Sequence, residues 1–246
     1  MQNIGIPLLL TTISGLSTML GAIIIFITKK ESTKLLVFAL SFAATIMFGI
    51  SISDLIPTAY SFLNNYYTLP IILLVILLGI GFTFLIDEYI PENKANTSKL
   101  YKIGIFSMLA ICLHNIPEGI ITFISSYEDL TLGISLTVAI TLHNIPEGIS
   151  ISLPIYYSTK SKFKALLYTF ISGISEPIGG LLIYLIFKNY INDFILNFIL
   201  LFVAGMMSYL GLVKLLPEAL KQKKYKLTIL SILIGICILL INHFIF

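Results

Sequence analysis

LHNIPEGI, residues 113–120, is repeated without change as residues 142–149, twenty-nine positions further along the chain. Both copies lie inside long apolar runs, where an imidazole, an amide and a carboxylate are costly to bury. The chain has three histidines, and two of them, His114 and His143, belong to these copies. Ionisable groups inside such runs are rare and mark functional sites. The repeat therefore predicts one site built from both copies.

The composition around the octapeptides is that of a membrane protein. Hydrophobic residues make up 57%, charged residues 11%, and the mean hydropathy is +1.00, whereas a soluble domain has about 25% charged residues. Runs of roughly 20 apolar residues cross a bilayer, and lone strands cannot satisfy their backbone in lipid. We predict an all-α integral membrane protein, a single transmembrane domain over 1–246. Its eight expected helices are 4–27, 35–60, 69–90, 102–125, 131–156, 163–187, 194–219 and 227–246.

The basic residues indicate the orientation. All fifteen are Lys, and thirteen of them fall on the first, third, fifth and seventh loops between the expected helices. Cytoplasmic loops carry an excess of Lys and Arg, so we expect these loops in the cytoplasm and both termini outside, in a multi-pass protein of the cell membrane. Lysines in short loops, without any Arg, are not a nucleic-acid signal. Membrane lipid is the expected surrounding, and no nucleic acid is expected as a partner.

Two weaker repeats frame the octapeptides. Residues 42–59 match residues 202–219 at a shift of 160, and residues 14–21 match residues 172–179 at a shift of 158. The matching positions include Phe42, Ala44, Met47, Leu55, Pro57 and Ala59 in the first case, and Ser14, Gly15, Ser17 and Gly21 in the second. Successive membrane helices alternate in direction, so two repeat-related helices run in opposite directions when their places in the order of helices differ by an odd number. The pattern predicts an inverted-repeat bundle of three helices, a central pair and three helices, as in many transporters.

Each octapeptide places its polar side chains on one helix face. Positions i and i+4 share a face, and this spacing relates His114 to Glu118 and His143 to Glu147. Two antiparallel copies offer two imidazoles and two carboxylates, a set that suits Zn²⁺ and also Fe²⁺, Mn²⁺, Co²⁺, Ni²⁺ or Cd²⁺. The carboxylates can bridge to a second ion held by the amides of Asn115 and Asn144, which gives a paired-metal centre. The alternative is a purely structural role, in which these side chains form hydrogen bonds between membrane helices.

The octapeptide prolines and glycines suggest further ligands. Pro117 and Pro146 lack the N–H that would bond the carbonyls of residues 113 and 142, and a proline ring kinks a helix. We expect Gly119 and Gly148 to loosen the following turn. Freed carbonyls are tolerated at mid-membrane where they line a cavity.

Other polar residues inside the spans extend the prediction. Glu176 is a third mid-membrane carboxylate, and its mate at the 158 shift is Thr18, so the symmetry is broken there. Asp54 and Glu218 suit an entrance and an exit for a cation, although solvated helix ends explain them equally well. Core packing or soft metal contacts account for three methionines, namely Met47, Met206 and Met207.

The doubled His-Asn-x-Pro-Glu-Gly motif, the Ser-Gly-x-x-Glu-Pro of residues 172–177 and the 3+2+3 layout resemble the ZIP family of divalent-metal transporters, closest to its bacterial, ZupT-like zinc-uptake branch. The resemblance covers essentially the whole chain. It implies one metal site of His114, Glu118, His143 and Glu147, and an adjacent site of Asn115, Asn144 and Glu176 with the shared carboxylates. It also implies uptake toward the cytoplasm, homodimers, and rocking of one group of helices against the rest.

One residue departs from that family pattern. Lys214 occupies the repeat position of Asp54, where family members often have an acid. A cation there opposes a metal ion on its way out, so we expect Lys214 to pair with Asp54 or Glu218.

The function that the residues favour is secondary transport of a divalent transition metal, zinc first, with the metal ion as substrate and no cofactor. The alternative is a membrane-embedded metal-dependent hydrolase, in which the same ligands activate water. The chain has no His-Glu-x-x-His motif and no evident separate general base, and a hydrolase has no use for inverted repeats. We therefore expect that the protein is not an enzyme.

Overall fold

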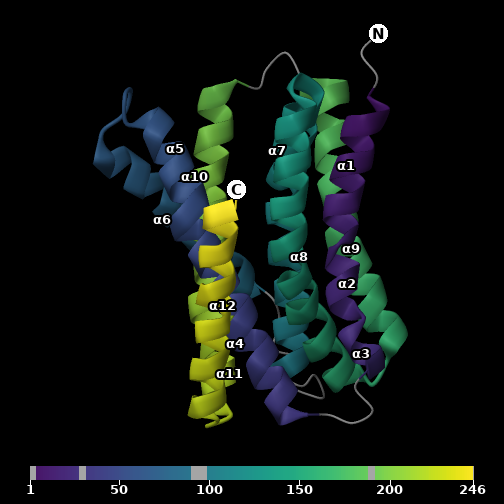
Figure 1. Ribbon diagram of the computed structural model, residues 1–246. Coiled ribbons are helices and arrows are strands. Elements are labelled where there is room, and N and C mark those ends of the chain that lie inside the picture. Colours follow the sequence, from purple (N-terminus) through teal and green to yellow (C-terminus); the bar gives the residue numbers. More distant parts are fainter. Residues whose placement is uncertain (1–3, 28–31, 90–98, 188–191, 246) are drawn as a thin grey trace.

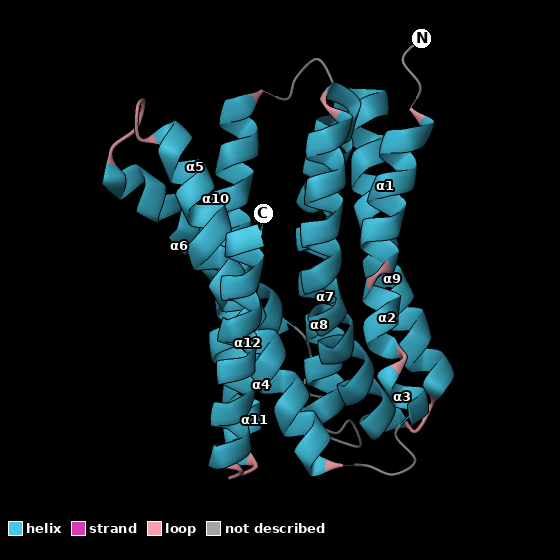
Figure 2. Ribbon diagram, in the orientation of Figure 1, coloured by secondary structure: helices cyan, strands magenta, loops and turns pink. Residues whose placement is uncertain are grey.

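The protein is all-helical over the part of the chain that the computed structural model describes, residues 4–27, 32–89, 99–187 and 192–245 (Figures 1 and 2). Six helical stretches in this part are long and apolar enough to cross a membrane: Gly5–Ile27, Thr33–Leu63, Leu69–Tyr89, Leu100–Glu128, Lys162–Ile186 and Asp193–Lys221. The predicted class, an all-α integral membrane protein, is confirmed.

Two more helices occupy the remaining expected ranges. Helix α8 (Leu130–Thr159) carries the second octapeptide, whose polar residues lower its hydropathy below that of the six stretches. Helix α12 (Tyr225–Ile245) is apolar over Tyr225–Ile241, the stretch whose side chains the structure describes. Every expected range is therefore helical to within a few residues, while length and apolarity alone support six crossings among the described residues.

The helices form two bundles, which Figure 1 shows side by side. The first, called here the site bundle, contains α1 (Gly5–Leu16), α2 (Thr18–Ala22), α3 (Ile24–Ile27), α7 (Lys99–Glu128), α8, α9 (Lys162–Leu182) and η2 (Ile183–Phe187). The second, called the flanking bundle, contains α4 (Thr33–Ile50), η1 (Ser51–Leu55), α5 (Ile56–Leu63), α6 (Leu69–Tyr89), α10 (Asp193–Tyr209), η3 (Leu210–Leu215), α11 (Leu216–Lys221) and α12.

The two bundles diverge toward the end of the molecule at which α1 begins, called here the upper end because it lies at the top of Figure 1. Toward the opposite, lower end they share one apolar core. Leu40 and Tyr209 of the flanking bundle belong to the same buried cluster as Phe106 and Ile151 of the site bundle. Because apolar packing is dense and contiguous there, the bundles are held together at the lower end.

The flanking bundle contains two π-helical turns at matching positions of the 160-residue repeat. They are η1 and η3, and each is followed by a short helix with proline near its start, Pro57 in α5 and Pro217 in α11. A π turn is rare and often marks a functional site. The proline has no N–H to give to the preceding turn, which explains why the helix widens at both places. The π turns therefore fall at equivalent positions of the sequence repeat.

The turns rich in lysine share the lower end. Helices α8 and α11 end there, and α4, α9 and α12 begin there (Figure 1). These helix ends carry Lys34, Lys160, Lys162, Lys164, Lys221, Lys223, Lys224 and Lys226. The expectations for Lys29, Lys30, Lys94 and Lys188 lie outside the described residues.

Candidate metal centre

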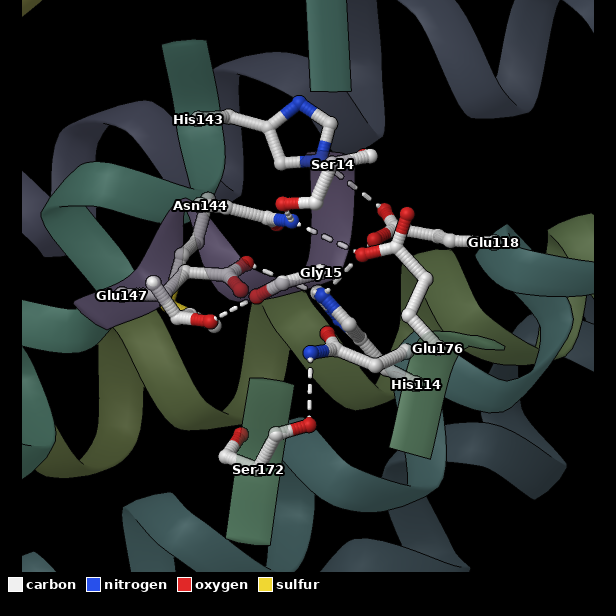
Figure 3. A network of polar contacts seen from close by, with 12 residues as sticks. Ser14, Gly15, His114, Glu118, His143, Asn144, Glu147, Ser172 and Glu176 are labelled. Carbon is white, nitrogen blue, oxygen red and sulfur yellow. Dashed lines mark hydrogen bonds and ion pairs between the residues drawn. The ribbon is translucent and has the colours of Figure 1, made fainter. Parts of the chain in front are cut away.

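The two octapeptides face each other from the middle of α7 and α8. Nε2 of His114 lies 2.9 Å from Oε1 of Glu147 on the other helix and 3.5 Å from Oε2 of Glu118 on its own. Nε2 of His143 lies 3.0 Å from Oε1 of Glu118 (Figure 3). Each of the four residues is less than a tenth exposed. The expected cluster of two imidazoles and two carboxylates is therefore formed between antiparallel helices.

The two asparagines are held by equivalent backbone carbonyls. Nδ2 of Asn115 donates to the carbonyl of Ser172 on α9 at 3.1 Å, and Nδ2 of Asn144 donates to the carbonyl of Ser14 on α1 at 3.0 Å. Ser14 and Ser172 are mates in the 158-residue repeat. Within the described residues, neither asparagine Oδ1 has a hydrogen-bond partner. Each amide is thus fixed through its nitrogen, which leaves its oxygen as a potential cation ligand.

Glu176 joins this cluster from α9. Nδ2 of Asn144 donates to its Oε2 at 2.9 Å, while its Oε1 has no hydrogen-bond partner in the described structure. The side chain is fully buried and lies within electrostatic reach of Glu118 and Glu147. The third predicted carboxylate is therefore next to the octapeptides.

The glycines of the octapeptides allow helices to touch. A Cβ on Gly119 would collide with the backbone carbonyl of Glu176, and a Cβ on Gly148 would collide with that of Thr18. The expectation that these glycines loosen the following turn is wrong, because α7 and α8 remain helical through Pro117 and Pro146. The glycines instead let α9 and α2 pack directly against the octapeptides, and α9 brings Glu176 to the cluster.

The centre contains more carboxylate oxygens than its hydrogen bonds satisfy. Three buried carboxylates meet two imidazoles, and Oε2 of Glu118, both carboxylate oxygens of Glu147 and Oε1 of Glu176 have no hydrogen-bond partner among the described atoms. The His114 to Glu147 contact is close but is not aligned as a hydrogen bond. Buried polar atoms are normally paired, so this surplus of acceptors favours a cation.

In the described part of the chain, no group of three or more His, Cys, Asp and Glu side chains is arranged to hold a metal ion as it stands. The imidazoles and carboxylates lie against one another instead. A metal ion would have to replace the His–Glu contacts with bonds to itself.

A cavity of about 400 Å³ leads toward this centre from the upper end. It lies between the bundles, with Asp54 of η1 on one wall and Glu118 and His143 on the other. The remaining lining residues are Ile50, Leu55, Thr58, Ile121, Leu136, Ala139, Ile140 and Leu200. Asp54 is half-buried and accepts a hydrogen bond from the Ser53 hydroxyl at 2.6 Å. The predicted entrance carboxylate thus lines the same cavity as two predicted ligands.

Comparison with known proteins decides the family. A sequence profile described as "ZIP Zinc transporter" matches residues 90–243, more than half of the chain. The chain belongs to the ZIP zinc transporter family. It is similar to proteins named "Zinc transporter ZupT" from Clostridium perfringens (36% identical, covering 100% of this chain and 98% of that protein) and Campylobacter jejuni subsp. jejuni (37%, covering 98% and 96%). A third, from Streptococcus mutans, is 35% identical, covering 100% of this chain and 99% of that protein.

Membership of the ZIP family confirms the predicted function class. The chain is a divalent-metal transporter, zinc being the metal of the family, and not an enzyme. The membrane hydrolase is not supported. The membrane setting and the metal ion as substrate agree with this family, and the protein is a multi-pass membrane protein.

The lower end of this ZIP-family protein corrects one prediction. Lys214 pairs with Asp87 of α6, not with Asp54 or Glu218. Glu218 contacts Nζ of Lys221 at 3.3 Å, while Asp54 faces the upper cavity. The reason is position: Lys214 lines the lower cavity together with Asp87, whereas Asp54 lines the upper one.

Glu218 is buried at 6% exposure and lines a smaller cavity of about 120 Å³ with Asp87, Lys214 and Phe106. The other lining residues are Lys102, Ile103, Val213 and Lys221. The three methionines, Met47, Met206 and Met207, are each 1–2% exposed. None of them lines either cavity, and Met47 and Met207 belong to the shared apolar core.

Sequence reasoning missed Asp87 and its second partner, Tyr209, whose hydroxyl donates to Oδ2 of Asp87 at 3.2 Å. Asp87 stands beside Glu88 near the end of α6 and reads like a solvated helix end. No local pattern distinguishes it. Only the pairing of α6 with α10 and η3 brings the three side chains together.

Proposed function

We propose that this protein carries zinc and related divalent cations toward the cytoplasm through a paired-metal site between α7 and α8. His114, Glu118, His143 and Glu147 form the first position. Asn115, Asn144 and Glu176 form the adjacent one, with Glu118 and Glu147 shared. The observation that carries the proposal is the upper cavity, which is lined at once by Asp54, Glu118 and His143.

The chemistry of the donors supports this assignment. Imidazole nitrogen and carboxylate oxygen are normal ligands of Zn²⁺, and they also accept Fe²⁺, Mn²⁺, Co²⁺, Ni²⁺ and Cd²⁺. A divalent ion gains the carboxylate and amide oxygens that have no hydrogen-bond partner in the described structure. Its binding breaks the three His–Glu contacts, whose N···O distances are between 2.9 and 3.5 Å. This exchange makes binding reversible, as transport requires.

The proposed orientation puts the upper end outside the cell and the lower end in the cytoplasm. The lysine-bearing helix ends at the lower end support it, and both termini would then be outside. We further propose eight spans in a 3+2+3 inverted repeat that form one transporter domain over residues 1–246. The equivalent π turns η1 and η3, and the equivalent contacts of Ser14 and Ser172, support the repeat.

Transport requires that access alternate between the two ends. The bundles diverge at the upper end and share an apolar core lower down. We propose that the flanking bundle rocks against the site bundle, which closes the upper cavity and opens the lower one. A homodimer is part of the proposal, and the exposed apolar face of α6, with Leu73, Leu77 and Leu85, offers it a surface.

The test is zinc uptake into vesicles that contain the purified protein. Wild-type vesicles should accumulate zinc, and Glu118→Ala and Glu147→Ala should each abolish uptake while the protein still inserts. The exposed acid Glu128 on α7 provides a control, Glu128→Ala, that should transport normally. Normal uptake in both Glu118→Ala and Glu147→Ala would refute the proposed site. Competition by other divalent metals, measured in the same vesicles, orders their affinities.

A further inference from the structure

Two repeat-related positions carry opposite charges and face opposite ends. Asp54 in η1 lines the upper cavity, and Lys214, 160 residues later in η3, lines the lower cavity. The upper cavity reaches Glu118 and His143, whereas no residue of the metal centre lines the lower one. In this structure the path is thus open from above and closed below, with a tethered cation at the closure.

The ammonium of Lys214 has partners in both bundles. Within the flanking bundle it forms an ion pair with Asp87 of α6, which also accepts the hydroxyl of Tyr209 at 3.2 Å. Across the boundary it lies over the ring of Phe106 on α7, 5.5 Å from the centroid, and the Tyr209 ring contacts the same ring at 6.3 Å between centroids. A cation over an aromatic face is attracted by the ring's quadrupole. Lys214 therefore ties the flanking bundle to the site bundle.

Resting on the proposed function, we propose that Lys214 is a gating residue: paired with Asp87 and seated on Phe106, its ammonium keeps the lower side of the transport path closed while the upper side is open. Opening the lower side by rocking must separate Lys214 and Tyr209 from Phe106. The ion pair with Asp87 lies within one bundle and can persist, so that Lys214 stays neutralised as the metal ion passes.

The other charged groups of the lower cavity come from both bundles. Lys221 and Glu218 are both on α11 and contact each other at 3.3 Å. Lys102 belongs to α7. Lys214 pairs with Asp87 of the flanking bundle and lies over the Phe106 ring of the site bundle, which makes it the residue to test.

The experiment measures how fast introduced cysteines react with a membrane-impermeant thiol reagent in vesicles. Cys112 and Cys237 are first replaced by Ala, and this background must retain zinc uptake. Ile103→Cys, in the wall of the lower cavity and 6% exposed, reports opening below. Ala139→Cys, in the wall of the upper cavity, reports opening above. The reagent is added to the side that each cavity faces.

Lys214→Met should raise the rate at Ile103→Cys by about threefold to tenfold, the range expected from losing a partly buried cation–π contact, and should lower the rate at Ala139→Cys. Lys214→Arg keeps the charge and the ring contact, so both rates should return toward the starting values. Phe106→Leu removes the ring but keeps an apolar side chain, and should act like Lys214→Met.

The matched control is Lys221→Met, which removes another lysine of the same cavity, one that contacts Glu218 of its own helix. It should leave both rates unchanged. The proposal is overturned if Lys214→Met and Phe106→Leu leave the Ile103→Cys rate unchanged, or if Lys221→Met raises it as much. The thiol reaction rates do not depend on transport. The Lys214 proposal can therefore be refuted while uptake still depends on Glu118 and Glu147, and the proposed metal site can be refuted while Lys214 still controls the thiol rates.

Discussion

The two octapeptides have identical sequences, and their surroundings are alike in the backbone but different in chemistry. Asn115 and Asn144 donate to the carbonyls of repeat mates, Ser172 and Ser14. Their glycines likewise touch the carbonyls of repeat mates, Glu176 and Thr18. The side chains at that last pair differ, since one is a carboxylate and the other a hydroxyl. Residues at repeat-related positions therefore hold the two octapeptides alike, and side chains outside the octapeptides make the site asymmetric.

Access is the second difference. His143 is 8% exposed and lines the upper cavity, whereas His114 is 1% exposed and does not line it. A cation arriving from above meets the second octapeptide's imidazole first. The first octapeptide's imidazole lies deeper, against Glu147.

The largest expected effect tests whether the two copies act as one site. His114→Ala and His143→Ala should each lower zinc uptake by about 100-fold, because even partners that only support metal ligands are worth about 10- to 100-fold. Uptake into vesicles at equal protein content measures this. If one of the two variants transports normally, the copies are not equivalent ligands and the shared site is wrong.

The next effect tests the broken symmetry. Glu176→Gln should lower zinc uptake by about 10-fold, since a buried carboxylate next to the site is lost, while Thr18→Ala at the mate position should leave uptake nearly unchanged. The hydroxyl of Thr18 donates to the carbonyl of Gly15 on its own chain segment and so faces no metal ligand in the described contacts. Equal losses of uptake in both variants would show that the Thr18 hydroxyl on α2 takes part in metal binding as well as in packing.

The shared frame predicts equal losses of stability. Gly119→Ala and Gly148→Ala each force a methyl group against a backbone carbonyl, which should cost about 1 to 3 kcal/mol. Thermal unfolding in detergent, followed by the fraction that remains monodisperse, measures the cost. Gly81, beside which a Cβ meets open space, gives the control Gly81→Ala, expected to leave stability within about 1 kcal/mol. A large difference between the two octapeptide variants contradicts the equivalence of the frame.

The smallest effect concerns access from above. Asp54→Asn should raise the zinc concentration for half-maximal uptake by about threefold at low salt and less at high salt, because a carboxylate in the cavity wall attracts cations and salt screens that attraction. Glu128→Gln, on the same end but outside that cavity, should not change it. A shift that ignores ionic strength would give Asp54 a role other than attraction.

Much of this architecture could be predicted from the sequence because apolar length and repeated motifs are local signals. The helical class, the ranges of the helices and the meeting of His114, Glu118, His143 and Glu147 all follow from them. The partner of Lys214 could not be predicted. Lys214 pairs with Asp87 because α6 packs on α10, and this packing is a tertiary contact that no local sequence pattern indicates. The role of Gly119 could not be predicted either, because the sequence does not distinguish a glycine that loosens a helical turn from one that allows another helix to pack closely.

The walls of the upper cavity have a consequence for selectivity. Seven of its eleven lining residues are Ile, Leu or Ala, so few groups can replace the water molecules around an arriving ion before it reaches His143 and Glu118. Mg²⁺ gives up its water reluctantly and prefers oxygen ligands, whereas Zn²⁺ accepts imidazole in a four-ligand shell. We expect dehydration on this apolar stretch to turn away the abundant hydrated cations before the ligands themselves discriminate.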